Sequence, residues 1–447
     1  MPATVGQARP EAIPKPHSPT PWHPVTRVAF RFCFCYFTLF CLLFPQILFV
    51  FTGVLGRLLP DYAVLWQMIA VDPATRSLGR WIFGVDTSLH ADSGSGDQPA
   101  TWMLVFCLLV ISAVVTALWS LLDRHRDSYH RLFSWFLVFL RLCLGGQMLF
   151  YGLAKVIPTQ MPEPPLSALL QPFGDFSPLS VLWLQVGSSP VYEMLLGSVE
   201  VAAGLLLFIP RTATLGALLS LASATQIFLL NMTFDVPVKI LSFHLLVASA
   251  VVLLPQAGRL ANVLVLARPA QPATQPLLFA DSRRNRVAAV AQMVIGLWVL
   301  TGLIQASWMA WHEFGGGQAR PELYGIWSVT EFNRAGKPVA PLTTDENRWQ
   351  RLVFDSQSAA TVQRMDGELV SVQATVDPAD KELTLTAPTD PGLLARFHYH
   401  RPAPEDLVLD GSVGGQPVTI ALRLVDPDSF TLNNRGFHWV QDYPYFR

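Results

Sequence analysis

Seven stretches of this chain are long and apolar enough to cross a lipid bilayer as helices, which takes about 20 residues each. Of the 447 residues, 51% are hydrophobic and only 14% are charged. A soluble protein carries about 25% charged residues, so the composition places the chain among multi-pass membrane proteins. We predict membrane spans at residues 30–53, 101–122, 132–156, 191–209, 212–231, 237–255 and 287–310.

The charges between the predicted spans indicate how the chain is oriented. Residues 123–131 carry three arginines and residues 256–286 carry five, whereas residues 157–190 carry no lysine or arginine. Basic residues concentrate on the cytoplasmic side of membrane proteins. We therefore expect a multi-pass protein of the bacterial-type cytoplasmic (inner) membrane, with a cytoplasmic N-terminus and an extracytoplasmic C-terminus.

The chain after the seventh span has a different character. GGGQAR at 315–320 is typical of a flexible tether, and beyond it apolar and polar side chains alternate in short runs such as YGIWSVTEF and LVSVQATV. Turn-forming pairs such as Asp366-Gly367 and Asp410-Gly411 separate these runs. The alternation predicts about eight strands in an all-β antiparallel barrel or sandwich outside the membrane.

The predicted organisation is thus an α-helical multi-pass membrane protein with a C-terminal β domain. A Pro-rich disordered cytoplasmic tail is followed by two helices with an extracytoplasmic loop, a four-helix bundle, a cytoplasmic linker with the seventh span, and the β domain. The boundaries are 1–26, 27–131, 132–265, 266–314 and 321–447. The aromatic residues near the C-terminus are expected to pack back onto the β domain, and a docking strand is the alternative; they are Tyr443, Tyr445 and Phe446.

Several ionisable side chains lie inside the predicted spans or at their ends, where a charged group costs roughly 2.5–3.5 kcal/mol on insertion scales. In the third span Gln147, Tyr151 and Lys155 recur every four residues and share one stripe. In the fourth span Glu193 and Glu200 share a face with glycines that let another helix approach closely. The simplest arrangement is a polar pocket, walled by spans three to six, that opens to the outside.

The turn between spans five and six completes the candidate site. Asp235 and Lys239 are four residues apart, a spacing that allows a helical ion pair. We interpret Glu200 and Lys155 as candidate catalytic residues, because a desolvated carboxyl group is suited to proton transfer. The candidate ligand-binding residues are Gln147, Tyr151, Glu193, Asn231, Asp235, Lys239 and His244.

Each of these side chains also has a structural interpretation. The two lysines and Glu193 lie near helix ends, where long side chains can reach back to water. Glu200 beside a lysine would be a structural ion pair, and His244 would be a hydrogen-bonded core histidine. The sequence leaves these alternatives open.

The stretch RLCLGGQMLFYGLAKV at 141–156 resembles the first characteristic helix of DoxX-like membrane proteins, through its R-x-x-L-G and Y-G-x-x-K features. EVAAGLLLFIPRTATLGALL at 200–219 is similar to that family's E-x-x-x-G-L-L-L helix and arginine turn, and NMTFDVPVKILSFHLL at 231–246 to the start of its last helix. The resemblance covers about residues 137–265. It implies a four-helix bundle whose motif residues here are Lys155, Glu200, Asn231 and Lys239.

Some DoxX-like proteins are associated with quinone-linked sulfur oxidation or thiol redox maintenance, so the resemblance implies quinone as a candidate ligand. This chain departs from the family by its additional spans and its outer β domain. It also lacks a C-x-x-C pair, which weakens a dithiol-exchange role. Its five cysteines lie in apolar stretches and are interpreted as packing residues.

The β domain resembles lipocalin-like domains through GIW at 325–327, near the start of the first predicted strand. A barrel of that type holds one small apolar ligand, or its own side chains fill it. No metal site is expected, because His398 and His400 share a strand face without a third ligand.

Three functions are compatible with the sequence. The first is a quinone-linked membrane redox subunit, and the second is binding or transfer of a lipid or small apolar ligand. The third is a membrane scaffold that presents the β domain to a membrane protein partner. Nucleic acid is not an expected partner, since the net charge is −1 and no nucleotide-binding motif occurs. Whether the chain is an enzyme stays open.

Overall fold

The structure is a computed structural model that describes residues 21–270, 277–386 and 395–446. Within these ranges, seven helical segments are long and apolar enough to cross a membrane. They are α1, α3, α4, α6, α7 with the turn before it, α8 continued by α9, and α10. The helices are α1 (Pro24–Leu43), α2 (Trp66–Phe83), α3 (Pro99–Leu122), α4 (His130–Val156), α5 (Pro178–Gly187), α6 (Pro190–Phe208), α7 (Ala213–Thr233), α8 (Lys239–Leu253), α9 (Ala257–Leu264), α10 (Ser282–Glu313) and α11 (Thr431–Asn434).

The predicted boundaries of the first span are wrong at both ends. α1 begins at Pro24, inside the predicted tail, and ends at Leu43 rather than at residue 53. Phe44 is extended, with ψ 134°, because proline lacks a backbone N–H and disfavours a helical conformation in the residue before it. The chain then continues as a 3-10 helix, Phe49–Leu58. The first 20 residues of the predicted tail lie outside the described residues.

Two predicted loops contain helices. α2 lies in the segment that separates the first two spans, and α5 lies in the segment between spans three and four. The glycine-rich segment 315–320 folds back on the end of α10, because the N–H groups of Gly315 and Gly317 both donate to the carbonyl of Trp311 at 3.1 Å. It is therefore partly ordered by hydrogen bonds, where the sequence indicates a flexible tether.

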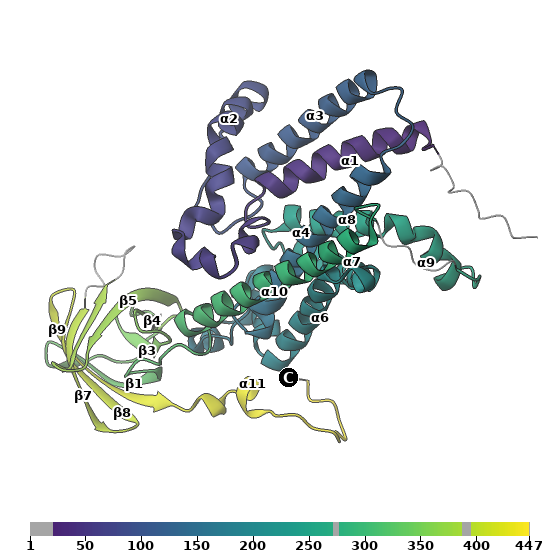
Figure 1. The fold of residues 1–447 in the computed structure, drawn as a ribbon. Coiled ribbons are helices and arrows are strands. Elements are labelled where there is room, and N and C mark those ends of the chain that lie inside the picture. The colour runs from purple at the N-terminus through teal and green to yellow at the C-terminus, as the bar shows by residue number, and fades with distance from the viewer. Residues whose placement is uncertain (1–20, 271–276, 387–394, 447) are drawn as a thin grey trace, which may run out of the picture. The chain divides into compact units, whose positions relative to one another are not determined.

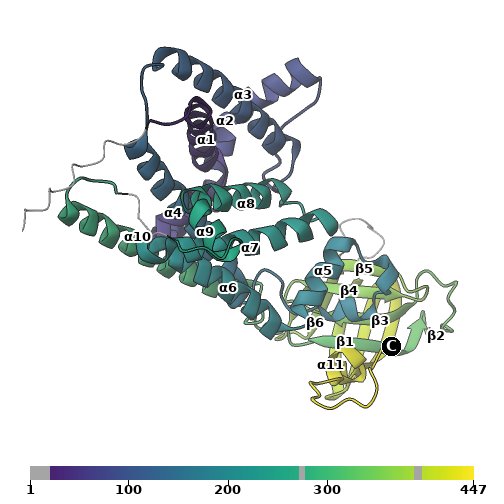
Figure 2. The ribbon, with the colours of Figure 1, turned by 90° about the vertical axis from the view of Figure 1, so that its right-hand side faces the viewer.

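The β domain is a closed antiparallel barrel, as the alternating runs predict. Eight strands pair in chain order and β1 pairs with β9 to close the ring, while the short β2 extends β1 as a hairpin (Figure 1). The strands are β1 (Gly325–Arg334), β2 (Lys337–Pro338), β3 (Trp349–Phe354), β4 (Ala359–Arg364), β5 (Leu369–Asp377), β6 (Glu382–Thr386), β7 (Ala395–Ala403), β8 (Asp406–Val413) and β9 (Gln416–Val425). Figure 2 shows the strands of the barrel from a second side.

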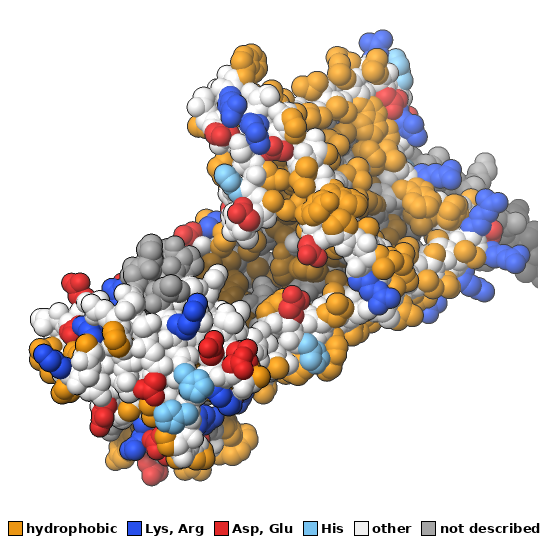
Figure 3. All heavy atoms as spheres, turned by 90° about the vertical axis from the view of Figure 1, so that its left-hand side faces the viewer, with side chains coloured by type: hydrophobic (Ala, Val, Ile, Leu, Met, Phe, Trp, Pro, Cys, Tyr) orange, Lys and Arg blue, Asp and Glu red, His pale blue; other side chains and the backbone are white. Residues whose placement is uncertain are grey.

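Large side chains fill the inside of the barrel. Trp327, Trp349, Phe354, Phe397 and Tyr399 are each less than 2% exposed and belong to one apolar cluster of the β domain. The residues between them along a strand face outward. In β7, for example, buried and exposed residues alternate. On the face shown in Figure 3, charged side chains are spread over the β domain and apolar ones cover most of the helical surface. This distribution agrees with helices in lipid and a barrel in water.

Two of the aromatic residues near the C-terminus, Tyr443 and Phe446, do not pack back onto the barrel, so the expectation is wrong for them. Tyr443 is 85% exposed and Phe446 is 98% exposed. Tyr445 is 44% exposed and has the guanidinium carbon of Arg435 4.2 Å from its ring centroid. The segment after β9 therefore presents apolar rings to its surroundings.

By its internal contacts the chain divides into two compact units. One comprises Met1–Gln147, Ala203–Thr225 and Pro237–Val299, and the other comprises Met148–Ala202, Gln226–Val236 and Leu300–Arg447. The second unit contains the barrel together with the adjoining parts of α4 and α6, where the candidate catalytic residues lie. Each unit is described below by its own contacts.

Candidate functional site

Two glycines bring α4 and α6 into close contact. A Cβ atom added at Gly197 would lie 2.5 Å from the carbonyl oxygen of Gly152, and one added at Gly152 would lie 2.7 Å from the backbone nitrogen of Val201. No larger side chain fits between the helices at these points, as is typical of packing through small residues in membranes. The close approach allows a short side chain on α6 to meet a side chain on α4.

Lys155 and Glu200 form an ion pair at this contact. The ammonium nitrogen of Lys155 lies 2.8 Å from one carboxylate oxygen of Glu200, and the two side chains are only 7% and 5% exposed. The ammonium group also donates to the backbone carbonyl of Tyr151 at 3.4 Å and lies 5.8 Å from the Tyr151 ring centroid. The structure thus brings together the two residues that the sequence singles out as catalytic.

Glu193 provides a second buried carboxyl group on α6. Its side chain is fully buried, and one oxygen accepts a hydrogen bond from the backbone N–H of Met161 at 3.0 Å. The other oxygen has no hydrogen-bond partner among the described residues. Gly197, one helical turn further along α6, lies against Lys155, since a Cβ atom added at Gly197 would be 2.7 Å from the Cβ atom of Lys155. The site therefore combines two buried carboxyl groups with one ammonium group, and one carboxyl oxygen is left unsatisfied.

The other residues of the predicted stripe on α4 have separate roles in the structure. Gln147 is fully buried, and its side-chain oxygen accepts a hydrogen bond from Gln46 at 3.0 Å. Gln46 has a positive φ of 62° in the turn after Pro45, so Gln147 stabilises a strained turn. Tyr151 contacts the Lys155 ammonium group through its ring and its carbonyl group.

Lys239 is the first residue of α8, and Asp97 holds this helix start. The carboxylate of Asp97 accepts hydrogen bonds from the backbone N–H groups of Lys239 and Ile240 at 2.8 and 2.9 Å. It also lies 3.8 Å from the ammonium group of Lys239. Asp97 precedes α3, and no local pattern in the sequence distinguishes it from the other aspartates of its loop.

Asn231 and Asp235 lie at the end of α7 and in the turn that follows. The carbonyl of Asn231 accepts a hydrogen bond from Val236 at 3.0 Å, and Asp235 has a positive φ of 54°. Asp235 and Lys239 are therefore not on one helix, and the helical spacing expected for them is not adopted. An ion pair between them stays a prediction.

His244 is a buried histidine with both ring nitrogens hydrogen-bonded. Nδ1 lies 2.6 Å from the carbonyl oxygen of Ile240, and Nε2 lies 2.6 Å from the hydroxyl oxygen of Tyr36. Its ring stacks on Phe40 with 3.9 Å between the centroids. These contacts fit the interpretation as a core histidine that joins α8 to α1.

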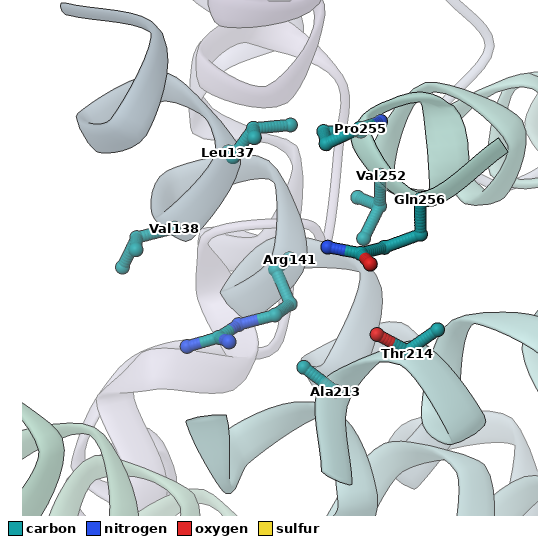
Figure 4. Close-up of a pocket in the computed structure, with 8 residues that line it drawn as sticks. All are labelled: Leu137, Val138, Arg141, Ala213, Thr214, Val252, Pro255 and Gln256. Carbon is teal, nitrogen blue, oxygen red and sulfur yellow. The ribbon is translucent and has the colours of Figure 1, made fainter. Parts of the chain in front are cut away.

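A separate small pocket lies beside Arg141, between α4, α7 and α8, and its volume is about 40 Å³. Figure 4 shows the guanidinium group of Arg141 directed away from the polar ends of Thr214 and Gln256. The guanidinium group hydrogen-bonds with Gln292 on α10, and no carboxylate in the described part of the chain forms an ion pair with it. A specific anion site would require polar groups that converge on one point. Arg141, Thr214 and Gln256, the three polar residues of this pocket, do not.

Outside the membrane segments, the barrel carries three ionisable side chains that contact one another: Glu322, Lys381 and Tyr399. Glu322 lies 2.8 Å from the ammonium group of Lys381 and accepts a hydrogen bond from the Tyr399 hydroxyl at 3.0 Å. The bond from Lys381 lowers the pKa of Glu322, while burial and the contact with Glu322 raise the pKa of Tyr399 to about 12. Among the described residues no group of three or more His, Cys, Asp or Glu side chains is arranged to hold a metal ion.

Comparison with known proteins supplies one relative. The uncharacterized protein YwoB of Bacillus subtilis is 37% identical over 122 residues, which cover 71% of that protein and 25% of this chain. The chain belongs to the YwoB family. Membership of the YwoB family assigns no activity, because that relative is itself uncharacterised. No protein-family model and no solved structure matches the chain.

Proposed function

We propose that this chain is a quinone-linked membrane redox subunit, in which Lys155, Glu200 and Glu193 form a proton-binding site. The observation that carries the proposal is the surplus of carboxyl groups. Glu200 is paired with the single ammonium group at 2.8 Å, while one buried oxygen of Glu193 has no hydrogen-bond partner in the described part of the chain. The resemblance to DoxX-like proteins adds quinone as the ligand class.

A charge count explains why such a site would exchange a proton. With all three groups ionised the site has a net charge of −1, and an unpaired charge is costly away from water. Uptake of one proton by a carboxyl group makes the site neutral, and release of the proton restores the surplus charge. A carboxyl group that alternates between its protonated and its ionised form can pass protons to and from a reacting group in apolar surroundings.

The residue types present fit a quinone. A quinone takes up two protons with two electrons when it is reduced, and its carbonyl oxygens accept hydrogen bonds. Lys155 is the hydrogen-bond donor of the site, Glu193 is the proton-exchanging group, and Glu200 keeps the ammonium group charged and in place. The fully buried environment of Glu193 excludes bulk water.

The test is mass spectrometry of small molecules that co-purify with the full chain in mild detergent. Wild type is compared with Glu200→Gln and Glu193→Gln, and Glu163→Gln is the control, because Glu163 is exposed and lies in the neighbouring loop. We expect quinone with wild type and the control, and its loss in both site variants. Quinone retained in both site variants, or lipid alone in every sample, contradicts the proposal.

The second candidate function is a scaffold, and the exposed aromatic C-terminus favours it. Tyr443 and Phe446 present apolar rings that the barrel does not cover. If this segment docks a protein partner, truncation after residue 440 abolishes the pull-down of that partner while the membrane site stays intact. Unchanged partners after truncation contradict the scaffold.

Apolar-ligand binding inside the barrel is the least supported of the three functions. Its interior contains several fully buried aromatic side chains, such as Trp327, Trp349 and Phe397. A ligand would have to displace these side chains, whose burial stabilises the domain by about 1.5–3 kcal/mol each.

A further inference from the structure

We propose that Asp355 of the barrel is a positioning residue for the membrane site, acting through residues 157–170, which we call the strap. The strap joins the end of α4 to the barrel surface and contacts Glu193 on its way. The barrel would thereby set how accessible Glu193 is. This inference deepens the proposed function, because it concerns control of the same carboxyl group.

At the barrel end, the strap is held by a carboxylate. The strap contains a 3-10 helix, Leu166–Leu170, and Asp355 directly follows β3. One oxygen of Asp355 accepts a hydrogen bond from the N–H of Leu166 at 2.6 Å, and the other accepts from Ser167 at 3.2 Å. Hydrogen bonds to an ionised acceptor are stronger than those between neutral groups.

The same 3-10 helix covers an apolar patch on the outer surface of the barrel. Leu166 packs against Ile326 and Val353, which are both fully buried. The adjacent strand residues Trp327 and Leu352 belong to the apolar cluster inside the barrel. Successive residues of a strand point to opposite faces, so Ile326 and Val353 lie on the outer face of the barrel, where the strap and Phe430 cover them. The strap is therefore part of the barrel's packing.

At the membrane end, the strap is held by Glu193 and α5. The N–H of Met161 donates to Glu193 at 3.0 Å, and the indole N–H of Trp183 donates to the carbonyl of Gln160 at 2.9 Å. A Cβ atom added at Gly187 would lie 2.3 Å from the carbonyl oxygen of Pro162, so α5 contacts the strap backbone directly. These contacts hold the strap backbone against Glu193 and α5.

The segment between the two ends is stiff. The sequence from Met161 to Leu166 is MPEPPL, with proline at three of its four central positions. Proline fixes φ and favours an extended chain, and Pro165 has φ −63° and ψ 154°. A displacement of Leu166 is therefore transmitted to Met161 instead of being absorbed between them.

The test measures how fast a hydrophobic carbodiimide, which reacts with protonated carboxyl groups in apolar surroundings, labels Glu193 in the full chain in detergent. The variants are Asp355→Ala and Asp355→Glu. Asp366→Ala is the matched control, because Asp366 also accepts a backbone hydrogen bond on the barrel, from Glu368 at 2.9 Å, but does not contact the strap. Amide hydrogen exchange of β6 and β7, which contribute no residue to the patch under the strap, checks that the barrel is folded.

We expect Asp355→Ala to increase the labelling rate of Glu193 by about tenfold or more, since two hydrogen bonds to a charged group are lost. Asp355→Glu should restore a rate close to wild type, and Asp366→Ala should leave it unchanged. An unchanged rate in Asp355→Ala with a folded barrel overturns the proposal, and so does an equal increase in the control.

A second variant avoids the barrel altogether. Replacing Pro162 and Pro164 by glycine removes the stiffness of the strap but leaves Asp355, its two hydrogen-bond partners and the capping residue Pro165 unchanged. We expect faster labelling of Glu193 here too, and a rate equal to wild type contradicts transmission through the strap. The labelling requires no redox activity, so a failed quinone assay and a failed labelling assay are distinguishable.

Discussion

The ion pair between Lys155 and Glu200 allows a quantitative test of the site. At 2.8 Å the Coulomb attraction between unit charges is about 6 kcal/mol for an effective dielectric constant of about 20. Removal of both charges from water offsets much of this attraction. The net value of the pair is therefore small, whereas a single unpaired charge left in the site is strongly unfavourable.

This reasoning predicts an asymmetry between single and double substitutions. Lys155→Met alone should reduce the free energy of local unfolding of α4 and α6 by about 3–5 kcal/mol, because it leaves a buried carboxylate without its partner. Lys155→Met combined with Glu200→Met should lie within about 2 kcal/mol of wild type, since it removes one charge of each sign and leaves the net charge of the site, which Glu193 carries, unchanged. The coupling energy is the difference between the double variant and the sum of the single ones.

An exposed pair with the same separation is the control. Arg364 and Glu368 on the barrel also lie 2.8 Å apart, but their side chains are 23% and 55% exposed. Removing Arg364 should cost about 0–1 kcal/mol, because water screens and solvates the remaining charge. Native-state hydrogen exchange of the peptides that carry each pair measures both local free energies in one experiment. We argue that burial, rather than the distance between the charges, sets the coupling energy of an ion pair. Equal coupling energies for the two pairs would refute this argument.

Three further predictions follow from the contacts described above. Gly197→Ala should destabilise the packing of α4 on α6 by about 1–3 kcal/mol, because the added Cβ atom would lie 2.5 Å from the facing backbone. Thermal denaturation measures this loss. Gly258→Ala is the control, since a Cβ atom there meets no atom within 4 Å and should leave the stability unchanged. Asp97→Ala should cost about 0.5–2 kcal/mol through loss of the helix cap on α8, and faster amide exchange in the first turn of α8 checks this. Glu322→Gln should weaken the barrel at neutral pH. The pKa of Glu322 is lowered in the folded state by Lys381, so the stabilisation is fully present above the ordinary value of 4.5 and is lost as the pH falls through the lowered folded-state pKa. Hydrogen exchange of the barrel strands should therefore differ between wild type and this variant at pH 7, and the difference should shrink as the pH is lowered below 4.5.

The sequence predicts the strands better than the end of the first helix, and the reason is local. Strands such as β6 and β7 are encoded by their own alternation of apolar and polar residues, which is complete within five to nine residues. The predicted first span instead follows an apolar run that continues past Pro45, where the backbone cannot stay helical. Hydropathy alone does not detect that break.

The candidate site is predictable in its residue types but not in its pairing. Lys155 and Glu200 stand out because ionisable groups are rare in apolar segments, and the glycines beside them indicate a close helix contact. That Lys155 pairs with Glu200, while Glu193 binds the backbone of Met161, depends on how α4 and α6 pack. Lys155 and Glu200 are 45 residues apart in the sequence, and no sequence pattern at that separation indicates that they pair.

The sequence by itself predicts seven apolar spans, a C-terminal β domain and a small set of ionisable groups within the spans. These features follow from composition and short-range periodicity. Only the tertiary structure decides that Asp97 caps α8 and that Asp355 holds the strap, since both aspartates lie next to loops and resemble any solvent-exposed acid in the sequence. Their partners are more than 140 residues away, and contacts over such separations arise from the packing of whole elements, which no local pattern records.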